Sequence, residues 1–237
     1  MRTALITGAN RGLGLATAEA LAEQGYHVIL GIRDMSKGIA LAAEFEERGW
    51  HASPCQLEVT NQESIVSAYE AIKKRWGRLD VLVNNAGVLL DFEEYTQHPS
   101  GLFTTNREML FKTLEVNTVA PYQLCEAFLS LMVSHHFGRI VNVTSGLGQL
   151  HQMEAGYPAY RLSKTALNAV TRIFSSLGKG KNVLVNSVDP GWVKTDMGGS
   201  SAPRSLKEGI DTIVWAATLP DGGPTGQFFL DRHSVEW

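Results

Sequence analysis

Two tyrosines and a lysine lie close together in the segment AGYPAYRLSK, which runs from Ala155 to Lys164. Tyr160 and Lys164 are four residues apart, so on a helix they share one face about one turn apart. Tyr157 precedes the lysine by seven residues and falls near the same face, a further turn away. An ammonium group beside a tyrosine favours the phenolate, which suits a general acid or base. The spacing does not decide which tyrosine serves, and an exposed helix pair has the same spacing.

Short apolar segments alternate with longer helical patterns along the chain. The short segments are apolar at consecutive positions, which is typical of parallel strands covered on both faces. We expect strands at Thr3–Thr7, His27–Ile32, Ala52–Leu57, Leu79–Asn84, Arg139–Thr144, Val183–Val188 and Gln227–Leu230. We expect helices at Leu13–Gln24, Lys37–Arg48, Gln62–Trp76, Arg107–His135, Tyr160–Leu177 and Leu206–Leu219. The repeated order predicts an α/β fold, a doubly wound parallel sheet of about seven strands with helices on both faces.

The composition limits the classes of protein that fit this chain. Its 237 residues, 44% apolar and 19% charged, indicate a single globular domain over residues 1–237. A net charge of −3 gives no reason to expect a nucleic-acid partner. No apolar run reaches the length of a membrane span, so we expect no membrane association. Cys55 and Cys125 lack metal-ligand spacing. We therefore expect buried free thiols, no metal, and a cytoplasmic location.

The first strand leads into the turn TGANRGLG, from Thr7 to Gly14, with glycines at 8, 12 and 14. Glycine permits a tight turn, lets a pyrophosphate approach the backbone, and lets the following helix pack closely with its N-terminus facing the phosphates. A glycine cluster between an opening strand and a helix therefore predicts a dinucleotide site. Three long connections, Val88–Asn106, Gly146–Ala159 and Gly191–Ser205, also follow strands and must lie at the same carboxyl edge of the sheet.

The end of the second strand bears on which dinucleotide binds. An NAD site usually has an acidic residue there, whereas this strand is followed by Arg33 and Asp34. Arg33, together with Arg11 in the glycine turn, could bind a 2′-phosphate through charge-assisted hydrogen bonds. Asp34 fits best as a helix cap, and Arg33 could also be a solvated surface charge. The two arginines together favour NADP(H) over NAD(H).

Several motifs occur in order along nearly the whole chain. They are TGxxxGxG in the first turn, NNAG at Asn84–Gly87, a strand ending in Ser145, YxxxK at Tyr160–Lys164, and PGWVKTDM at Pro190–Met197. In this set the chain resembles the short-chain dehydrogenase/reductase family, whose members have a single-domain Rossmann fold. The segment from Pro190 and the ending PTGQFFLDRHSVEW look most like the carbonyl reductase branch, which is largely NADPH-dependent and reduces aldehydes, ketones and quinones.

The resemblance implies roles for the residues of the reaction site. Tyr160 would be the general acid in reduction, with its pKa lowered by Lys164 and by the oxidised nicotinamide. Lys164 would also bind the nicotinamide ribose, Ser145 would hold the carbonyl oxygen, and Asn117 would order a water beside the lysine. The implied cofactor contacts are Gly8, Asn10, Arg11, Gly12, Leu13, Gly14, Arg33, Leu57, Glu58, Asn85, Ala86, Gly87, Tyr160, Lys164, Pro190, Gly191, Val193 and Thr195.

The chain departs from the family pattern at two points. Glu58 stands where the family often has aspartate near the adenine. Animal carbonyl reductases have a long insertion before the catalytic tyrosine, whereas here Ser145 and Tyr160 are only fifteen residues apart. Without that insertion, a face formed by the two long helices should be open for a partner, so the resemblance implies a homodimer or homotetramer. The candidate interface residues are Leu124, Phe128, Leu131, Met132, Ala169, Ile173 and Phe174, and the alternative is that they pack inward on the sheet.

The long connections carry apolar residues that would form the walls of a substrate pocket. These are Leu89, Leu90, Phe92, Leu147, Leu150, Met153, Trp192 and Met197. Such a pocket suits a small apolar carbonyl substrate. His151, on one of these connections, could equally be solvated. Two other functions remain open: an NAD-preferring alcohol or 3-hydroxyacyl dehydrogenase, and a non-catalytic NADP-binding sensor.

Overall fold

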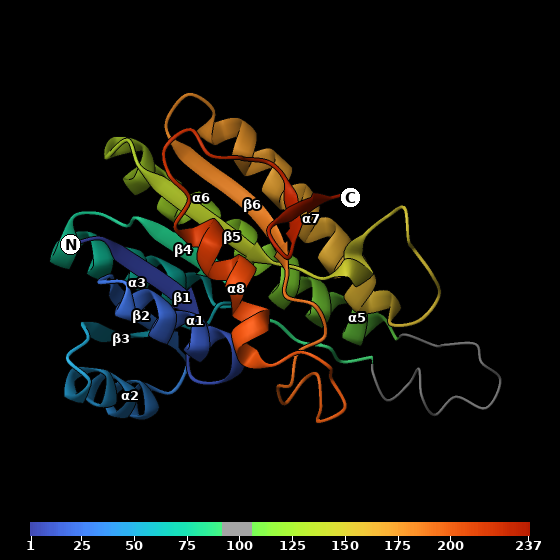
Figure 1. The fold of residues 1–237 in the computed structure, drawn as a ribbon, viewed down its shortest axis with the longest axis horizontal. Helices are drawn as coiled ribbons and strands as arrows, with labels where there is room; N and C mark the ends of the chain where they lie inside the picture. The colour runs from blue at the N-terminus through green and yellow to red at the C-terminus, as the bar shows by residue number, and fades with distance from the viewer. Residues whose placement is uncertain (92–105) are drawn as a thin grey trace.

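A computed structural model describes residues 1–91 and 106–237 of the chain. Its described residues form one sheet of eight strands in the order β3-β2-β1-β4-β5-β6-β7-β8 (Figure 1). Every neighbouring pair from β3 to β7 is parallel, and β8 is antiparallel to β7. The strands are β1 Thr3–Thr7, β2 His27–Ile32, β3 Ala52–Gln56, β4 Val81–Asn84, β5 Gly138–Val143, β6 Val183–Asp189, β7 Phe228–Leu230 and β8 His233–Val235.

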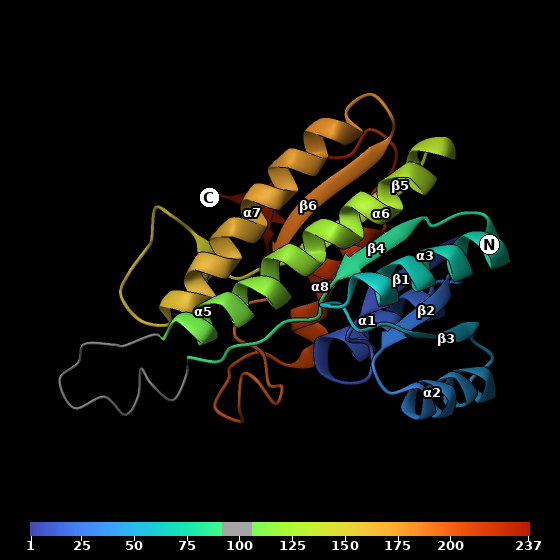
Figure 2. The ribbon, with the colours of Figure 1, turned by 180° about the vertical axis from the view of Figure 1, so that it is seen from behind.

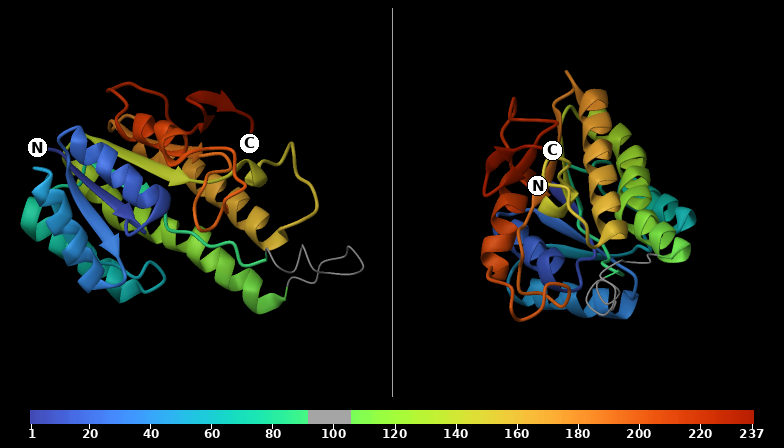
Figure 3. Two further views of the ribbon diagram at one scale, coloured as in Figure 1. Left: turned by 60° about the horizontal axis from the view of Figure 1, so that its bottom comes forward. Right: turned by 90° about the vertical axis from the view of Figure 1, so that its right-hand side faces the viewer.

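Helices cover both faces of this sheet (Figures 2 and 3). They are α1 Gly12–Glu23, α2 Met35–Glu47, α3 Gln62–Trp76, α5 Arg107–Leu114, α6 Ala120–Ser134, α7 Pro158–Gly178 and α8 Leu206–Ala217. Because side chains alternate along a strand, Leu5 packs in a core with α3, α6 and α7, whereas Ala4 and Ile6 pack in a second core with α1, α2 and α8. The doubly wound parallel sheet predicted from the consecutive apolar runs is therefore confirmed.

The eighth strand was missed by the sequence analysis. It follows β7 through a tight turn in which Asp231 and Arg232 have φ values of 49° and 63°. Two consecutive residues with positive φ form the type of turn that suits a two-residue hairpin, and glycine or asparagine usually marks it. Aspartate followed by arginine gives a much weaker signal, so the hairpin was not expected.

The long helix expected at Arg107–His135 is interrupted. A π-helical turn, η1, spans Glu115–Val119 between α5 and α6. Such turns place one extra residue in the helix and are frequent at functional sites. Asn117 lies within it and is fully buried.

Five of the seven expected interface residues point into the core and not toward solvent. Leu124, Phe128, Leu131, Met132 and Phe174 are at most 6% exposed and belong to the core between the sheet and the helices. The prediction was wrong for them because α6 and α7 pack against the sheet and also against each other, which needs a wider apolar stripe than one contact does. Ala169 and Ile173 are exposed, as expected.

The remaining expectations from composition can be compared with the described residues. Both cysteines are free thiols, and Cys125 is buried, whereas Cys55 is only partly buried. Burial raises the pKa of the Cys55 thiol to about 11 and that of Cys125 to about 12, so neither is a reactive thiolate near neutral pH. Among the described helices, none combines the length and the apolar character that a membrane crossing requires.

Candidate active site

The glycine turn after β1 has the geometry that a pyrophosphate site needs. Gly8 and Gly12 have φ values of 65° and 54°, in the left-handed region that favours glycine. A Cβ on Gly14 would lie 2.5 Å from the Asn85 Nδ2 atom, so only glycine lets α1 pack this closely. No side chain caps the N-terminus of α1, where Arg11 is the capping residue. The first amides of α1 are thus without a side-chain acceptor at the place where a phosphate would bind.

Thr7 ties this turn to the end of β4. Its hydroxyl accepts hydrogen bonds from the backbone amides of Asn85 (3.0 Å) and Ala86 (2.9 Å). The Asn85 side chain donates back to the Thr7 carbonyl oxygen at 2.8 Å. The NNAG segment, including Gly87, therefore lies beside the glycine turn, as its expected role under the cofactor requires. Thr7 was not among the expected site residues, although it is the first residue of the glycine motif.

The residues after β2 separate into a cap and an exposed arginine. Asp34 caps α2, because its Oδ1 accepts from the amides of Ser36 (3.1 Å) and Lys37 (3.5 Å), in agreement with the preferred interpretation. The Arg33 side chain is 80% exposed, with its guanidinium 3.9 Å from a Glu58 carboxylate oxygen. The pair of Arg11 and Asp196 is closer, so Arg11 already has an anionic partner. Of the two arginines, Arg33 is better placed to receive a 2′-phosphate.

Tyr160, Lys164 and Ser145 meet at the carboxyl end of β5. Tyr160 and Lys164 lie on the first turns of α7, with the lysine Nζ atom 5.5 Å from the tyrosine ring centroid. Lys164 donates to the Val143 carbonyl oxygen at 2.8 Å, and the Ser145 hydroxyl lies near enough to the Tyr160 phenol to lower its pKa. Tyr157 instead lies at the N-cap of α7 with φ of 50°, and its carbonyl accepts the Arg161 amide. The structure thus brings Tyr160 together with the serine and the lysine.

Asn117 connects the NNAG segment to α7. Its Oδ1 accepts from the Val88 amide at 2.8 Å, and its Nδ2 donates to the Val88 carbonyl (2.8 Å) and to the Ser163 hydroxyl (3.0 Å). These partners explain why an asparagine, unfavourable inside most helices, is present at the π-helical turn. A Cβ on Gly87 would lie 3.3 Å from Asn117 Oδ1 and 3.6 Å from Lys164 Nζ, so Gly87 borders both side chains.

The electrostatics around Tyr160 differ from the expectation. Burial raises the pKa of the Tyr160 phenol, the carboxylates of Asp189 and Asp91 raise it further, and the hydrogen bond with Ser145 lowers it. In the protein alone the direction is therefore the reverse of the one expected from Lys164. Burial lowers the pKa of Lys164 to about 8, while Asp189 opposes that change. Desolvation dominates because both side chains are packed between α7 and the sheet.

A buried carboxylate that no motif marks holds the start of α7. Asp91, 1% exposed, follows β4, and its Oδ2 accepts from the backbone amides of Ala159 (2.8 Å) and Tyr160 (3.4 Å). No side chain of α7 caps this end of the helix, so Asp91 supplies the cap from elsewhere in the chain. Its Oδ1 is buried and has no hydrogen-bond partner among the described residues.

We expect Asp91→Ala to lower the free energy of unfolding by about 1–2 kcal/mol, because two amides of the first turn of α7 lose their acceptor. Asp91→Asn keeps an acceptor oxygen and should lose less. Denaturant titration of the three proteins measures both effects. Equal stability of Asp91→Ala and the unchanged protein would show that this cap contributes nothing.

The expected pocket residues lie on the loops at this edge. Leu89, Leu90 and Leu147 are partly buried, and Phe92 lies outside the described residues. Leu150, Met153, Trp192 and Met197 are exposed, so these loops present apolar side chains to solvent. His151 instead contacts the C-terminus, with its Nδ1 atom 3.3 Å from the Trp237 carbonyl oxygen. Of the remaining expected cofactor residues, Val193 is buried and Thr195 lies beside Gly12.

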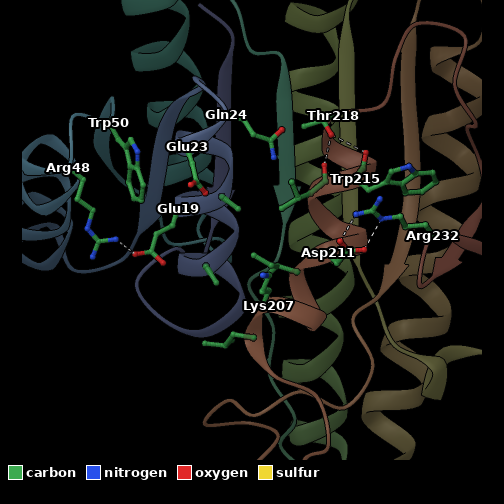
Figure 4. Close-up of a pocket in the computed structure, with 15 residues that line it drawn as sticks. Glu19, Glu23, Gln24, Arg48, Trp50, Lys207, Asp211, Trp215, Thr218 and Arg232 are labelled. Atoms are coloured by element: carbon green, nitrogen blue, oxygen red, sulfur yellow. Dashed lines mark hydrogen bonds and ion pairs between the residues drawn. The ribbon is translucent and has the colours of Figure 1, made fainter.

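A separate groove of about 650 Å³ lies between α1 and α8 (Figure 4). Four of the charged side chains that line it form two ion pairs, Glu19 with Arg48 and Asp211 with Arg232. None of the expected catalytic residues lines it. The groove is therefore not where the expected chemistry would occur.

The chain is similar in sequence and in structure to several known proteins. A model described as short chain dehydrogenase matches residues 2–205. Carbonyl reductase (NADPH) 1 of Sus scrofa is 30% identical over 282 positions, covering 100% of this chain and 94% of that protein. The (+)-neomenthol dehydrogenase of Arabidopsis thaliana is 31% identical, covering 100% and 98%. The crystal structure of NADPH bound carbonyl reductase from chicken fatty liver superposes with a TM-score of 0.86 at 25% identity, covering 100% and 99%.

Proposed function

Because this chain belongs to the short chain dehydrogenase family, we propose that it is an NADPH-dependent carbonyl reductase with Tyr160 as its general acid. The chain is an oxidoreductase acting on C=O and CH–OH groups, with NADP(H) as its cofactor. The observation that carries the finer proposal is the meeting of Tyr160, Lys164 and Ser145 beside the glycine turn. The names of the pig and chicken relatives agree with it.

Residues of this chain fit the two ends of the cofactor. The glycine turn and the uncapped N-terminus of α1 suit the pyrophosphate, and the exposed Arg33 suits the 2′-phosphate. Lys164 would bind the nicotinamide ribose, with Asn85–Gly87 lying beneath the adenine ribose. When bound, the nicotinamide supplies the hydride that reduces the carbonyl carbon.

The proton is the part of the reaction that the protein's own residues carry out. Ser145 donates a hydrogen bond to the carbonyl oxygen and holds it near Tyr160. As negative charge develops on that oxygen, the Tyr160 phenol transfers its proton to it. The raised pKa of Tyr160 keeps the phenol protonated before the reaction, which is the form that reduction needs. We expect Lys164, with a water ordered by Asn117, then to return a proton to Tyr160.

We propose apolar aldehydes, ketones or quinones as substrates. Exposed Leu150, Met153 and Trp192 on the loops at the carboxyl edge of the sheet support this, since apolar walls favour apolar ligands. The test is NADPH oxidation by the purified protein with a panel of aldehydes, ketones, quinones and 3-ketoacyl thioesters. We expect turnover with at least one apolar carbonyl compound. Turnover confined to thioesters, or to NADH, would support the alternative dehydrogenase function instead.

Specific observations disfavour the two alternatives. An NAD-preferring enzyme would use an acidic side chain after β2, but Asp34 is occupied as a cap of α2. A non-catalytic sensor would not need Tyr160, Lys164 and Ser145 in one place. A cytoplasmic location stays a prediction.

We also propose that the protein is a homodimer or homotetramer, with a revised interface. Leu162, Ala169, Ile173 and Leu177 are exposed along α7, and Val119 and Tyr122 are exposed at the start of α6. Burying them against a second copy would stabilise a dimer by roughly 25 cal/mol for each Å² of apolar surface removed from water.

Light scattering behind a sizing column measures this assembly. We expect at least twice the monomer mass of 25.9 kDa at micromolar concentration. Ile173→Glu should shift the protein toward the monomer, because it places a charge in the centre of the stripe, whereas Ile39→Glu on α2 should not. A single species near 25.9 kDa for the unchanged protein would refute the assembly.

A further inference from the structure

Asp189 is a buried carboxylate that the proposed reaction does not use. It is the last residue of β6 and is 9% exposed. Its Oδ1 accepts the Gly191 amide at 2.8 Å, and a Cβ on Gly146 would lie 3.0 Å from its Oδ2. The carboxylate therefore fills the space between the ends of β5 and β6. No motif in the sequence analysis singled it out, although it directly precedes Pro190.

The sheet register brings Asp189 beside the reaction site. Val143 of β5 pairs with Val188 of β6, and the Thr144 amide donates to the Val188 carbonyl at 2.8 Å. Asp189 thus lies next to Thr144 and Ser145. Side chains alternate along a strand, so Asp189 points to the same face as Ser187, whose hydroxyl is 2.8 Å from Thr171 of α7. That face is the one covered by the helix that carries Tyr160 and Lys164.

Several other charged or titratable groups surround this cluster. Asp91, after β4, bonds to the Tyr160 amide. Arg161, the neighbour of Tyr160 on α7, donates to the carbonyls of Gly156 and Leu147. Burial raises the pKa of Asp189, the amides of Gly191 and Gly146 and the charge of Arg204 lower it, and Arg204 itself is held by two hydrogen bonds to Asp231. The negative charge of Asp189 affects both Tyr160 and Lys164. It favours the neutral phenol of Tyr160 and the charged ammonium of Lys164.

We propose that Asp189 is a positioning residue that keeps Lys164 in its ammonium form and Tyr160 in its phenol form. This proposal rests on the proposed function. The physical reason is that a carboxylate in a site of low dielectric attracts a cation and repels a phenolate. Burial favours the neutral amine of Lys164 and Asp189 opposes that loss of the proton, and with both effects present the pKa of Lys164 is lowered to about 8. The site is thereby held in the state in which it can donate a proton to a carbonyl.

The first test does not depend on turnover. Protein labelled with ¹³C at the lysine Cε atoms is titrated by NMR, and the Lys164 signal is identified by its absence in Lys164→Met. In the unchanged protein we expect a midpoint near pH 8. In Asp189→Asn, which keeps an oxygen for the Gly191 amide, we expect the midpoint to fall by about one pH unit. An unchanged midpoint would overturn the proposal.

Asp80→Asn is the matched control. Asp80 is another buried carboxylate, 1% exposed, but it lies before β4 at the opposite edge of the sheet and bonds to Thr3 and Arg78. We expect this variant to lose stability without moving the Lys164 titration. If Asp80→Asn lowers the midpoint as much as Asp189→Asn does, the shift reflects general loosening and the proposal is wrong.

A second test uses the reaction itself. At saturating NADPH, the alkaline limb of the pH profile of kcat/KM should move to lower pH in Asp189→Asn by a similar amount. A uniform loss of rate with an unmoved limb would show a structural role only and would contradict the proposal. If no carbonyl compound is reduced by any variant, the proposed function fails, while the NMR titration still decides the role of Asp189.

Discussion

Replacing Tyr160 with phenylalanine is expected to lower kcat for carbonyl reduction by about a hundred- to ten-thousandfold, the range that losing a general acid typically costs. Phenylalanine keeps the ring that packs between α7 and the sheet but removes the hydroxyl that lies near Ser145. Steady-state rates with the best substrate of the panel measure the loss.

Two controls separate the loss of a proton donor from damage to the site. NADPH binding to Tyr160→Phe should stay close to that of the unchanged protein, as measured by fluorescence titration. Tyr157→Phe removes the other hydroxyl of the same segment and should leave kcat within a few-fold. The assignment is wrong if Tyr157→Phe is the crippling change and Tyr160→Phe is nearly normal.

Arg33→Ala should weaken NADPH binding by about ten- to a hundredfold and leave NADH binding almost unchanged. A charge-assisted hydrogen bond contributes roughly 1.5–3 kcal/mol, which corresponds to that range. The Arg33 guanidinium is exposed, and its ion pair with a Glu58 carboxylate oxygen is long, at 3.9 Å. It can therefore turn to a phosphate at little cost. Isothermal calorimetry with the two cofactors gives both affinities.

Arg48→Ala is a suitable control for the charge change. Arg48 is also a surface arginine, but it pairs with Glu19 at the groove between α1 and α8. Its removal should alter neither cofactor affinity. Should Arg33→Ala weaken NADPH and NADH equally, Arg33 would be a structural residue that does not recognise the 2′-phosphate.

The fold could be predicted from the sequence because buried strands and helices each require a regular pattern of apolar residues. Strands buried on both faces must be apolar at consecutive positions, and β1, which is buried at all five residues, shows this directly. It was harder to predict which face of each helix packs against the sheet. Leu124, Phe128 and Leu131 form one stripe by spacing, but only the structure shows that this stripe faces the sheet and that Ile173 on α7 faces outward.

The candidate site was accessible only where a motif marks it. The spacings of Tyr160 and Lys164 and of the glycines in the first turn each suggest a function from the sequence alone. Asp91 and Asp189 do not, since each lies far along the chain from the helix that it influences, and single aspartates are common at loop starts. In the protein alone, burial raises the pKa of Tyr160, the reverse of the direction expected with Lys164 and the oxidised nicotinamide beside it, and that burial depends on packing that no spacing reveals.

The most direct test of the proposed function follows the hydride from NADPH to the product. The purified protein is given NADPH deuterated at the transferable position together with an apolar ketone or aldehyde, and the product is analysed by mass spectrometry. We predict an alcohol carrying one deuterium at the former carbonyl carbon, formed in proportion to the cofactor oxidised and almost absent with Tyr160→Phe. Alcohol without deuterium, or undiminished formation by Tyr160→Phe, would contradict the central claim.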